Sequence, residues 1–218
     1  MKAHFVRRSK TLLVASETAA LLVALAMAVQ GACASEGTQD ISPIRRLYNS
    51  INQELAGSKE ASCTRFVTSP NDYEKNVWHR VDSSAEFEGK HFARAKVCFT
   101  KGKHLAKATF EVFSEAGDWA DLREHYYYPN GRLAFFFKRQ PTIQAYDTAN
   151  DREIPGAPYV LERRLYFDPN GKTLRKLEKA FSEKGKTEFP ASYVYPIEFE
   201  IYMTIEQLPF GKEMKSSW

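Results

Sequence analysis

The turn sequence Tyr126-Tyr-Tyr-Pro-Asn-Gly-Arg-Leu133 returns 40 residues later as Tyr166-Phe-Asp-Pro-Asn-Gly-Lys-Thr-Leu174. In each copy, proline sets φ at the first turn position and asparagine tolerates the second. Glycine then takes the left-handed position that closes a bulged hairpin. Asp168 also suits the first position of its turn. The two copies therefore predict two tight hairpins between neighbouring antiparallel strands. An internal repeat and shared turn chemistry explain the doublet equally well.

The segments before the first hairpin have the composition of further strands, because they are rich in β-branched and aromatic residues and are separated by turn residues. The segment 197–203 alternates strictly between apolar and polar side chains, which predicts a strand with one buried and one wet face. Pro196 before it is typical of a strand start or an edge. The earlier predicted strands are 64–68, 77–81, 91–100 and 105–114.

A helix is predicted before the first strand. Ser42 suits the cap and Pro43 the first helical position, and Gly57 is a plausible end. Five apolar residues between them fall at helical spacing and form one stripe that must dock on something. They are Ile44, Leu47, Tyr48, Ile51 and Leu55.

These elements together predict an α+β fold: an N-terminal helix followed by a mostly antiparallel β-meander of about eight strands. We expect a single domain over residues 41–210 and a flexible C-terminal tail over residues 211–218. The segment from Gln140 to Pro158 contains several proline and glycine residues. It is expected to be a long, mobile surface loop between the hairpins.

Residues 1–34 have the pattern of a signal peptide. Four basic residues precede an apolar run from Ala19 to Val29, and small residues at 32 and 34 match the spacing that a signal peptidase reads. The run is too short for a bilayer-spanning helix. This predicts export to the periplasm or the medium, with a polar spacer over residues 35–40. An uncleaved membrane anchor is the alternative interpretation of residues 1–34.

Cys33 supports a second interpretation of the leader. A cysteine that follows an apolar run and two small residues resembles the lipobox of bacterial lipoproteins, in which the cysteine becomes lipidated. Gln30 departs from that pattern, because the family usually has an aliphatic residue there. Cleavage after Ala34 is therefore the first expectation, and a lipid anchor at Cys33 is the alternative.

Charge and cysteine content bound the function further. The chain has 31 Lys and Arg against 27 Asp and Glu, and without the leader these numbers become 27 and 26. A chain so close to neutral lacks the excess positive charge that is typical of nucleic-acid-binding proteins. Cys63 and Cys98 are the two cysteines outside the leader, and in an exported protein they predict one disulfide. A pair of buried, unlinked thiols is the alternative.

Aromatic residues are concentrated in the first hairpin. Because their rings project from both sides of the ribbon, both faces must be covered. Core packing is the first explanation. The alternative is an apolar groove for a lipid, a peptide or a glycan. The residues of this tentative binding site are Tyr126, Tyr127, Tyr128, Phe135, Phe136 and Phe137.

A basic cluster surrounds the second hairpin. Lysines there are first explained as protection of a sheet edge against unwanted pairing, and contact with an anionic envelope surface is the alternative. Nearby acidic residues partly offset the cluster. Its members are Arg163, Arg164, Lys172, Arg175, Lys176, Lys179, Lys184 and Lys186.

No catalytic or cofactor motif stands out. The histidines at 79, 91, 104 and 125 fall in no metal-binding pattern, and neither a nucleophile elbow nor a phosphate-binding loop occurs. We therefore predict no catalytic residue, no metal and no cofactor. A hydrolase with an unrecognised site remains an alternative, and it would depend on His91 or His125.

The helix around 44–52 and the two Pro-Asn-Gly hairpins, together with the leader, resemble a pattern of uncharacterised exported bacterial proteins of this size. The hairpins are also similar to the Tyr-x-x-Gly-Lys-Leu repeats of MORN-type β-meanders. These motifs are structural, so the resemblance implies a fold class and export from the cytoplasm but no activity.

The leading hypothesis for function is a non-enzymatic exported binding or scaffold protein of the bacterial envelope. A carrier or chaperone for a lipid-like or peptide ligand is the alternative. The expected partner is an envelope protein, a peptide or an amphiphilic small molecule, and we expect no nucleic acid. Membrane contact is expected only if Cys33 is lipidated.

Overall fold

A computed structural model describes residues 39–57, 62–100, 104–184, 187–197 and 200–210. The predicted signal peptide with Cys33, most of the polar spacer and the predicted tail from residue 211 lie outside the described residues.

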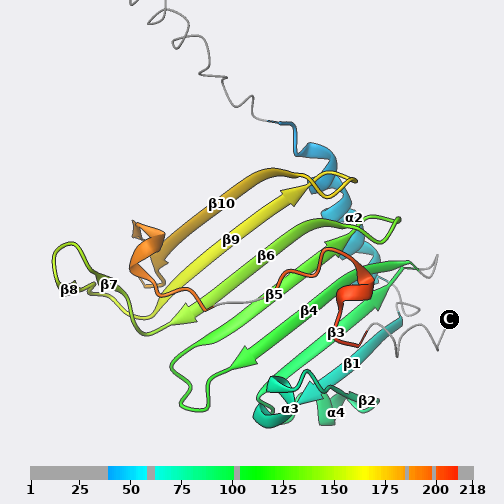
Figure 1. The fold of residues 1–218 in the computed structure, drawn as a ribbon, viewed down its shortest axis with the longest axis horizontal. Coiled ribbons are helices and arrows are strands. Elements are labelled where there is room, and N and C mark those ends of the chain that lie inside the picture. Colours follow the sequence, from blue (N-terminus) through cyan, green and yellow to red (C-terminus); the bar gives the residue numbers. More distant parts are fainter. Residues whose placement is uncertain (1–38, 58–61, 101–103, 185–186, 198–199, 211–218) are drawn as a thin grey trace, which may run out of the picture. The chain divides into compact units, whose positions relative to one another are not determined.

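The described chain is mostly antiparallel β-sheet with a few helices (Figure 1). The strands of the main sheet are β1 (Ser62–Thr68), β2 (His79–Val81), β3 (Ala93–Phe99), β4 (Leu105–Phe113), β5 (Ala120–Tyr127), β6 (Leu133–Thr142), β9 (Tyr159–Phe167), β10 (Thr173–Ser182) and β11 (Glu188–Phe189). Their spatial order is β11-β10-β9-β6-β5-β4-β3-β1-β2, so the sheet is a meander except at the β2 edge. The main sheet has nine strands where about eight were expected: β2 falls within the predicted strand 77–81, whereas the two-residue strand β11 was not predicted.

The helices are short except for the first, which matches the range expected from its apolar stripe. Asp40 Oδ1 accepts a hydrogen bond from the backbone N–H of Ser42 at 2.8 Å, so Asp40 rather than Ser42 supplies the capping oxygen. No helix among the described residues combines the length and the apolar character that crossing a membrane requires. The helices are α2 (Ser42–Gly57), α3 (Pro70–Glu74), α4 (Ser84–Phe87), and the 3₁₀ turns η1 (Ala191–Tyr193) and η2 (Ile205–Gln207).

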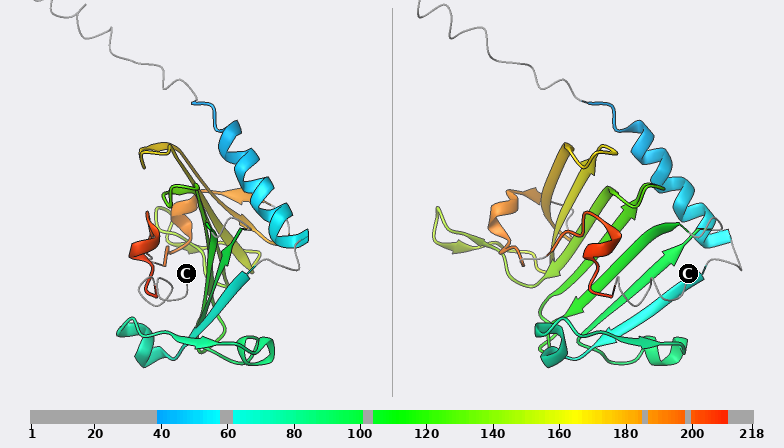
Figure 2. Two further views of the ribbon diagram at one scale, coloured as in Figure 1. Left: turned by 90° about the vertical axis from the view of Figure 1, so that its right-hand side faces the viewer. Right: turned by 45° about the vertical axis from the view of Figure 1, so that its right-hand side comes forward.

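Two different structures cover the two faces of the sheet (Figure 2). Helix α2 packs on one side, here called the helix face, where Ile44 and Ile51 meet Tyr126 and Phe135. The C-terminal residues 194–197 and 200–210, here called the C-terminal strap, lie on the opposite side, here called the strap face. The strap buries Tyr202, Leu208 and Phe210 against an apolar cluster of the sheet that includes Phe66, Phe110, Tyr127 and Phe136. The rings of the first hairpin are therefore divided between two cores.

The two Pro-Asn-Gly hairpins form as predicted and join β5 to β6 and β9 to β10. Gly131 and Gly171 have φ of +78° and +89°, the left-handed region that glycine enters without strain. Asp168 Oδ1 accepts the backbone N–H groups of Asn170 and Lys172. The two turns also contact each other, because Asn130 Nδ2 donates to Pro169 O at 3.3 Å. The doublet thus ends in two turns that lie side by side.

The predicted strand over residues 197–203 is wrong for the residues that the structure describes. Residues 197 and 200–203 belong to no strand ladder, and they cross the strap face instead. Tyr202, which the alternation placed on the wet side, is 9% exposed and lies in the core, whereas Ile201 and Met203 are only half-buried. The two edges of the sheet are already occupied by the short strands β11 and β2. This segment therefore packs on an apolar face of the sheet and does not extend an edge.

The segment between the two hairpins contains regular β-structure as well as loop. β6 continues to Thr142, which lies opposite Tyr159 of β9. Within the segment, β7 (Tyr146–Asp147) and β8 (Arg152–Glu153) form a separate two-stranded ribbon. The expected surface loop from Gln140 to Pro158 is therefore partly strand, because the β6–β9 ladder extends into its first three residues and β7 and β8 pair within it.

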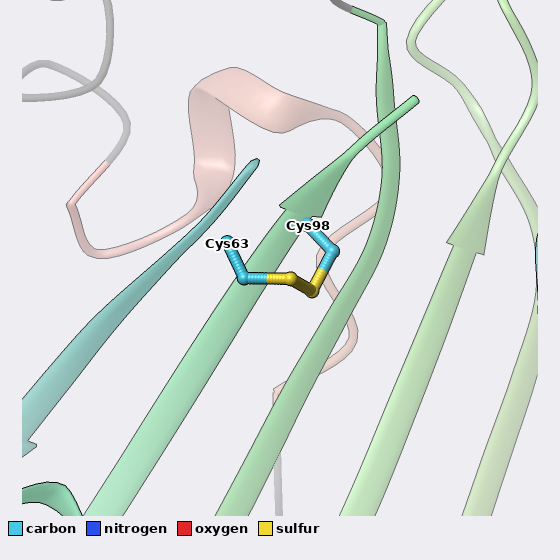
Figure 3. Close-up of a disulfide and its surroundings, with 2 residues drawn as sticks. All are labelled: Cys63 and Cys98. Atoms are coloured by element: carbon cyan, nitrogen blue, oxygen red, sulfur yellow. A yellow bond between two sulfur atoms is a disulfide. The ribbon is translucent and has the colours of Figure 1, made fainter. Parts of the chain in front are cut away.

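The structure contains the predicted disulfide between Cys63 of β1 and Cys98 of β3 (Figure 3). The two residues are direct partners in the antiparallel ladder, and their Cα atoms lie 4.1 Å apart. A bond between directly opposed residues is compatible with an oxidising compartment.

Candidate ligand groove on the helix face

An open groove of about 400 Å³ lies between helix α2 and the sheet. Its apolar surface comes from Ile44 and from aromatic rings of α2, β6 and β9, while polar and charged side chains complete its wall. The groove exists because α2 is only 16 residues long, about 24 Å, and covers only part of the helix face. The lining residues are Ile44, Arg45, Tyr48, Asn49, Glu124, Phe135, Phe137, Arg164 and Tyr166.

The aromatic floor is held by ring contacts between the helix and the sheet. The ring of Tyr48 lies 4.8 Å from that of Tyr126 and 5.5 Å from that of Phe135. Phe135 in turn lies 4.9 Å from Tyr166 of the neighbouring strand. These contacts fix the floor, whereas Phe137, farther along β6, stays half-buried and faces the groove.

The six aromatic residues predicted as a binding site separate into two groups. Phe135 and Phe137 line the groove, and Tyr126 packs directly beneath it. Tyr127 and Phe136 lie on the strap face, where they are almost fully buried. Tyr128 donates its hydroxyl hydrogen bond to Phe167 O at 2.8 Å, which ties the two hairpins together. The division follows from the alternation of side chains along a strand, which sends successive rings to opposite faces.

Charged groups beside the floor are paired with each other. Lys107 Nζ lies 2.6 Å from Glu124 Oε1 and 4.7 Å from the centre of the Tyr126 ring. The Tyr126 hydroxyl donates to Glu124 Oε2 at 3.0 Å and lies 3.2 Å from the side-chain amide of Asn52 on the helix. Burial and the carboxylate of Glu124 raise the pKa of Tyr126 far above its ordinary value, so this tyrosine is neutral and acts as a structural donor.

Two arginines stand at the rim of the groove. Arg164 lies 2.9 Å from Glu162 and 5.7 Å from the centre of the Phe137 ring, but Glu162 also lies 3.8 Å from Lys179. Arg45 is exposed on the helix and forms no salt bridge with another described residue. The rim therefore carries more positive than negative charge, and its guanidinium groups can bind an anionic group.

Four members of the basic cluster around the second hairpin are paired with acidic residues. Arg163 and Lys176 share Glu178 at 2.7 and 3.0 Å, and Arg164 and Lys179 share Glu162. Two of these pairs, Arg163–Glu178 and Lys179–Glu162, join β9 to β10, so these members are part of the paired sheet surface. Lys186 lies outside the described residues.

The histidines of the alternative hydrolase hypothesis are not brought together. His91 is partly exposed and contacts Glu86 O at 2.6 Å. His125 is fully buried and lies across β4 from Val97, about 20 Å along β3 from residue 91. Burial and the nearby Arg123 lower the pKa of His125 to about 3. No group of three or more metal-ligating side chains occurs within the part of the chain that the structure describes.

Sequence reasoning missed the residues that turn the aromatic floor into a groove. Tyr48 was placed on the helix stripe, Tyr166 in the second turn motif and Arg164 in the basic cluster. Nothing in their local patterns connects them, because their convergence depends on where α2 crosses the sheet. The one available signal was the need to cover rings on both faces of the first hairpin.

Comparison with known proteins gave no match to a family model, to a curated protein or to a solved structure. The function is therefore inferred from the geometry of the groove itself.

Proposed function

We propose that this chain is an exported, non-enzymatic binding protein of the bacterial cell envelope, which holds an anionic single-chain amphiphile in the groove on the helix face. The observation that carries the proposal is the combination of an aromatic floor with arginines at the rim. The apolar part of the ligand would lie on Phe135, Phe137 and Tyr166, and its acidic head group would meet Arg45 and Arg164.

An amphiphile fits this groove better than an extended peptide does. The strands of the floor, β6 and β9, are interior strands whose backbone groups already pair with their neighbours. A peptide would therefore find no free strand edge for main-chain hydrogen bonds. The volume of about 400 Å³ is near the lower end for ligand pockets and suits one acyl chain.

The openness of the groove favours reversible surface binding. A carrier that shields its cargo needs an enclosed cavity, whereas this site has α2 on one side only. Purification without detergent followed by lipid extraction separates the two functions. An empty extract supports reversible binding, and a stoichiometric bound lipid supports the carrier.

Calorimetric titration of the oxidised protein with dodecanoate tests the ligand class, with dodecyltrimethylammonium as the cationic counterpart. We expect dodecanoate to bind more tightly. Phe137→Ala should weaken both ligands about tenfold, because it removes apolar contact area. Arg45→Gln should weaken only dodecanoate, about two- to fivefold.

Arg46→Gln is the matched control, because Arg46 is the next residue of the same helix, is exposed and does not line the groove. Equal effects of the two arginine substitutions, or absence of dodecanoate binding, would show that the groove is not the site. Mass spectrometry of the mature N-terminus tests export independently. Cleavage after Ala34 and lipidation at Cys33 give different masses, and an uncleaved chain contradicts export by this leader.

A further inference from the structure

A second cavity, also of about 400 Å³, opens on the strap face and has a buried guanidinium in its wall. The side chain of Arg123 is 3% exposed. Its Nε lies 3.1 Å from Asp121 Oδ2, its Nη2 donates to the hydroxyl of Tyr73 at 3.3 Å, and the guanidinium lies 5.5 Å from the centre of the Phe110 ring. The cavity is lined by Tyr73, Glu74, Asn76, Trp78, Phe110, Arg123, Glu200 and Tyr202.

Arg123 keeps unused capacity to donate hydrogen bonds. A guanidinium has five N–H donors, and Tyr73 is the acceptor of its single hydrogen bond within the described chain. The neighbouring Asp121 carboxylate is shared with Lys138, whose Nζ lies 3.5 Å away. A buried cation with one shared carboxylate and free donors is a favourable partner for a second anionic group.

The walls of the cavity are aromatic and are packed against one another. The Trp78 ring lies 6.0 Å from that of Tyr73 and 5.9 Å from that of Phe110, and Phe110 lies 5.2 Å from Tyr202. These mutual contacts hold the rings in place before any ligand arrives. A planar or apolar group can pack against them.

Two carboxylates also line the cavity. Glu74 and Glu200 are exposed, whereas Arg123 is buried. Burial and the Glu200 carboxylate raise the pKa of Tyr202, and Arg123 opposes that shift, so the two charges act on the same ring. The cavity thus combines exposed carboxylates, a buried cation and aromatic walls.

We infer that this cavity is a second binding site, separate from the groove on the helix face, for a small zwitterion with an aromatic side group, such as an aromatic α-amino acid. Its carboxylate would pair with Arg123, its ammonium group with Glu74 and Glu200, and its ring with Trp78, Phe110 and Tyr202. Each charge of the ligand thereby meets the opposite charge.

Calorimetric titration with three matched probes tests the charge pattern. L-Phenylalanine carries both charges, 3-phenylpropanoate only the negative charge and phenethylamine only the positive charge. We expect affinity to fall in that order. Tighter binding of phenethylamine than of L-phenylalanine, or no saturable binding of any probe, overturns the inference.

Substitutions locate the site. Arg123→Gln should weaken L-phenylalanine about ten- to a hundredfold, because it removes a charge-assisted contact. Arg123 is buried, so this variant can fail to fold. Glu200 is exposed, so Glu200→Gln should fold normally. This variant should weaken the binding of L-phenylalanine but not that of 3-phenylpropanoate. Glu115→Gln, an exposed glutamate in the turn between β4 and β5 that does not line the cavity, is the matched control and should change nothing.

Competition separates this site from the proposed groove. Saturating L-phenylalanine should leave dodecanoate binding unchanged, because the two sites lie on opposite faces of the sheet. Displacement of dodecanoate by L-phenylalanine overturns the second site. Binding of L-phenylalanine by a protein that does not bind dodecanoate contradicts only the proposed function.

Discussion

The helix face and the strap face belong to the same sheet but receive different kinds of cover. Helix α2 satisfies most of its own backbone hydrogen bonds, so the sheet beneath it need not supply polar partners for the backbone of the helix. The C-terminal strap has no ladder of its own, so the sheet must supply polar partners for its backbone. A sheet face therefore needs buried polar side chains where an irregular segment covers it, and it does not need them where a helix covers it.

The anchors of the strap show this requirement directly. Lys138 Nζ donates to Ile197 O at 2.6 Å. Gln140 donates to Tyr195 O at 2.8 Å and accepts the backbone N–H of Ile197 at 3.0 Å. Tyr127 donates its hydroxyl hydrogen bond to Tyr202 O at 3.1 Å. By contrast, the Ile44 and Ile51 anchors of α2 are apolar.

The largest expected loss of stability comes from removing the buried carboxylate of Asp121 beneath the strap. Asp121→Ala leaves Arg123 and Lys138 buried without the carboxylate they share, and we expect a loss of about 3–5 kcal/mol in the free energy of unfolding. Urea denaturation of the oxidised protein at neutral pH measures this loss. Asp82→Ala is the control, because Asp82 is 87% exposed, and it should change stability by no more than about 0.5 kcal/mol. A loss below about 1 kcal/mol for Asp121→Ala would contradict the anchoring role of the charges.

The pH dependence of stability tests the strap face through His125. This residue lies among Phe110, Phe136 and Tyr202. Burial lowers its pKa from 6.5 to about 3, so between these values the unfolded chain binds a proton that the folded chain does not. Stability therefore falls as the pH falls through this window. Relative to a His125→Leu variant, the parent should lose roughly 3 kcal/mol between pH 6.5 and about pH 4. Parallel stability curves for the two proteins would show that His125 does not titrate in this way.

The smallest and most closely matched test compares the hydroxyl groups of two consecutive tyrosines that lie on opposite faces of the sheet. Tyr127→Phe leaves the Tyr202 carbonyl in the strap face without its donor and should lower the free energy of unfolding by about 1–2 kcal/mol. Tyr126→Phe removes a donor from Glu124, which keeps its ion pair with Lys107, and should cost about 0.5–1 kcal/mol. Chemical denaturation of both variants provides the measurement. A larger effect at Tyr126 would reverse the proposed difference between the faces.

Local patterns predicted the elements whose chemistry is local. The Pro-Asn-Gly turns determine both hairpins through the φ of their glycines, and the apolar stripe of α2 identifies the helix and its buried side. The pairing of Cys63 with Cys98 followed from the small number of cysteines in a chain that is predicted to carry a signal peptide. Each of these features depends on residues that are neighbours in sequence or have no competing partner.

The strap and both cavities depend on contacts between distant segments, and no local pattern encodes them. The alternation at 197–203 suits a strand equally well, but the available surface was a sheet face rather than an edge. In β5, Asp121, Arg123 and His125 share a side with Tyr127, while Leu122, Glu124 and Tyr126 share the other. Both sides mix polar and apolar residues, so the sequence of β5 does not show which side is buried with its charges.

The position of the disulfide has a consequence for exchange between copies of the chain. Cys63 lies at the start of β1, the first strand after α2, and Cys98 lies on the interior strand β3. A domain-swapped dimer that exchanged α2 and β1 would have to form this bond between two molecules instead of within one. Oxidation within a single chain therefore keeps the helix of the groove and the floor of the groove in the same molecule.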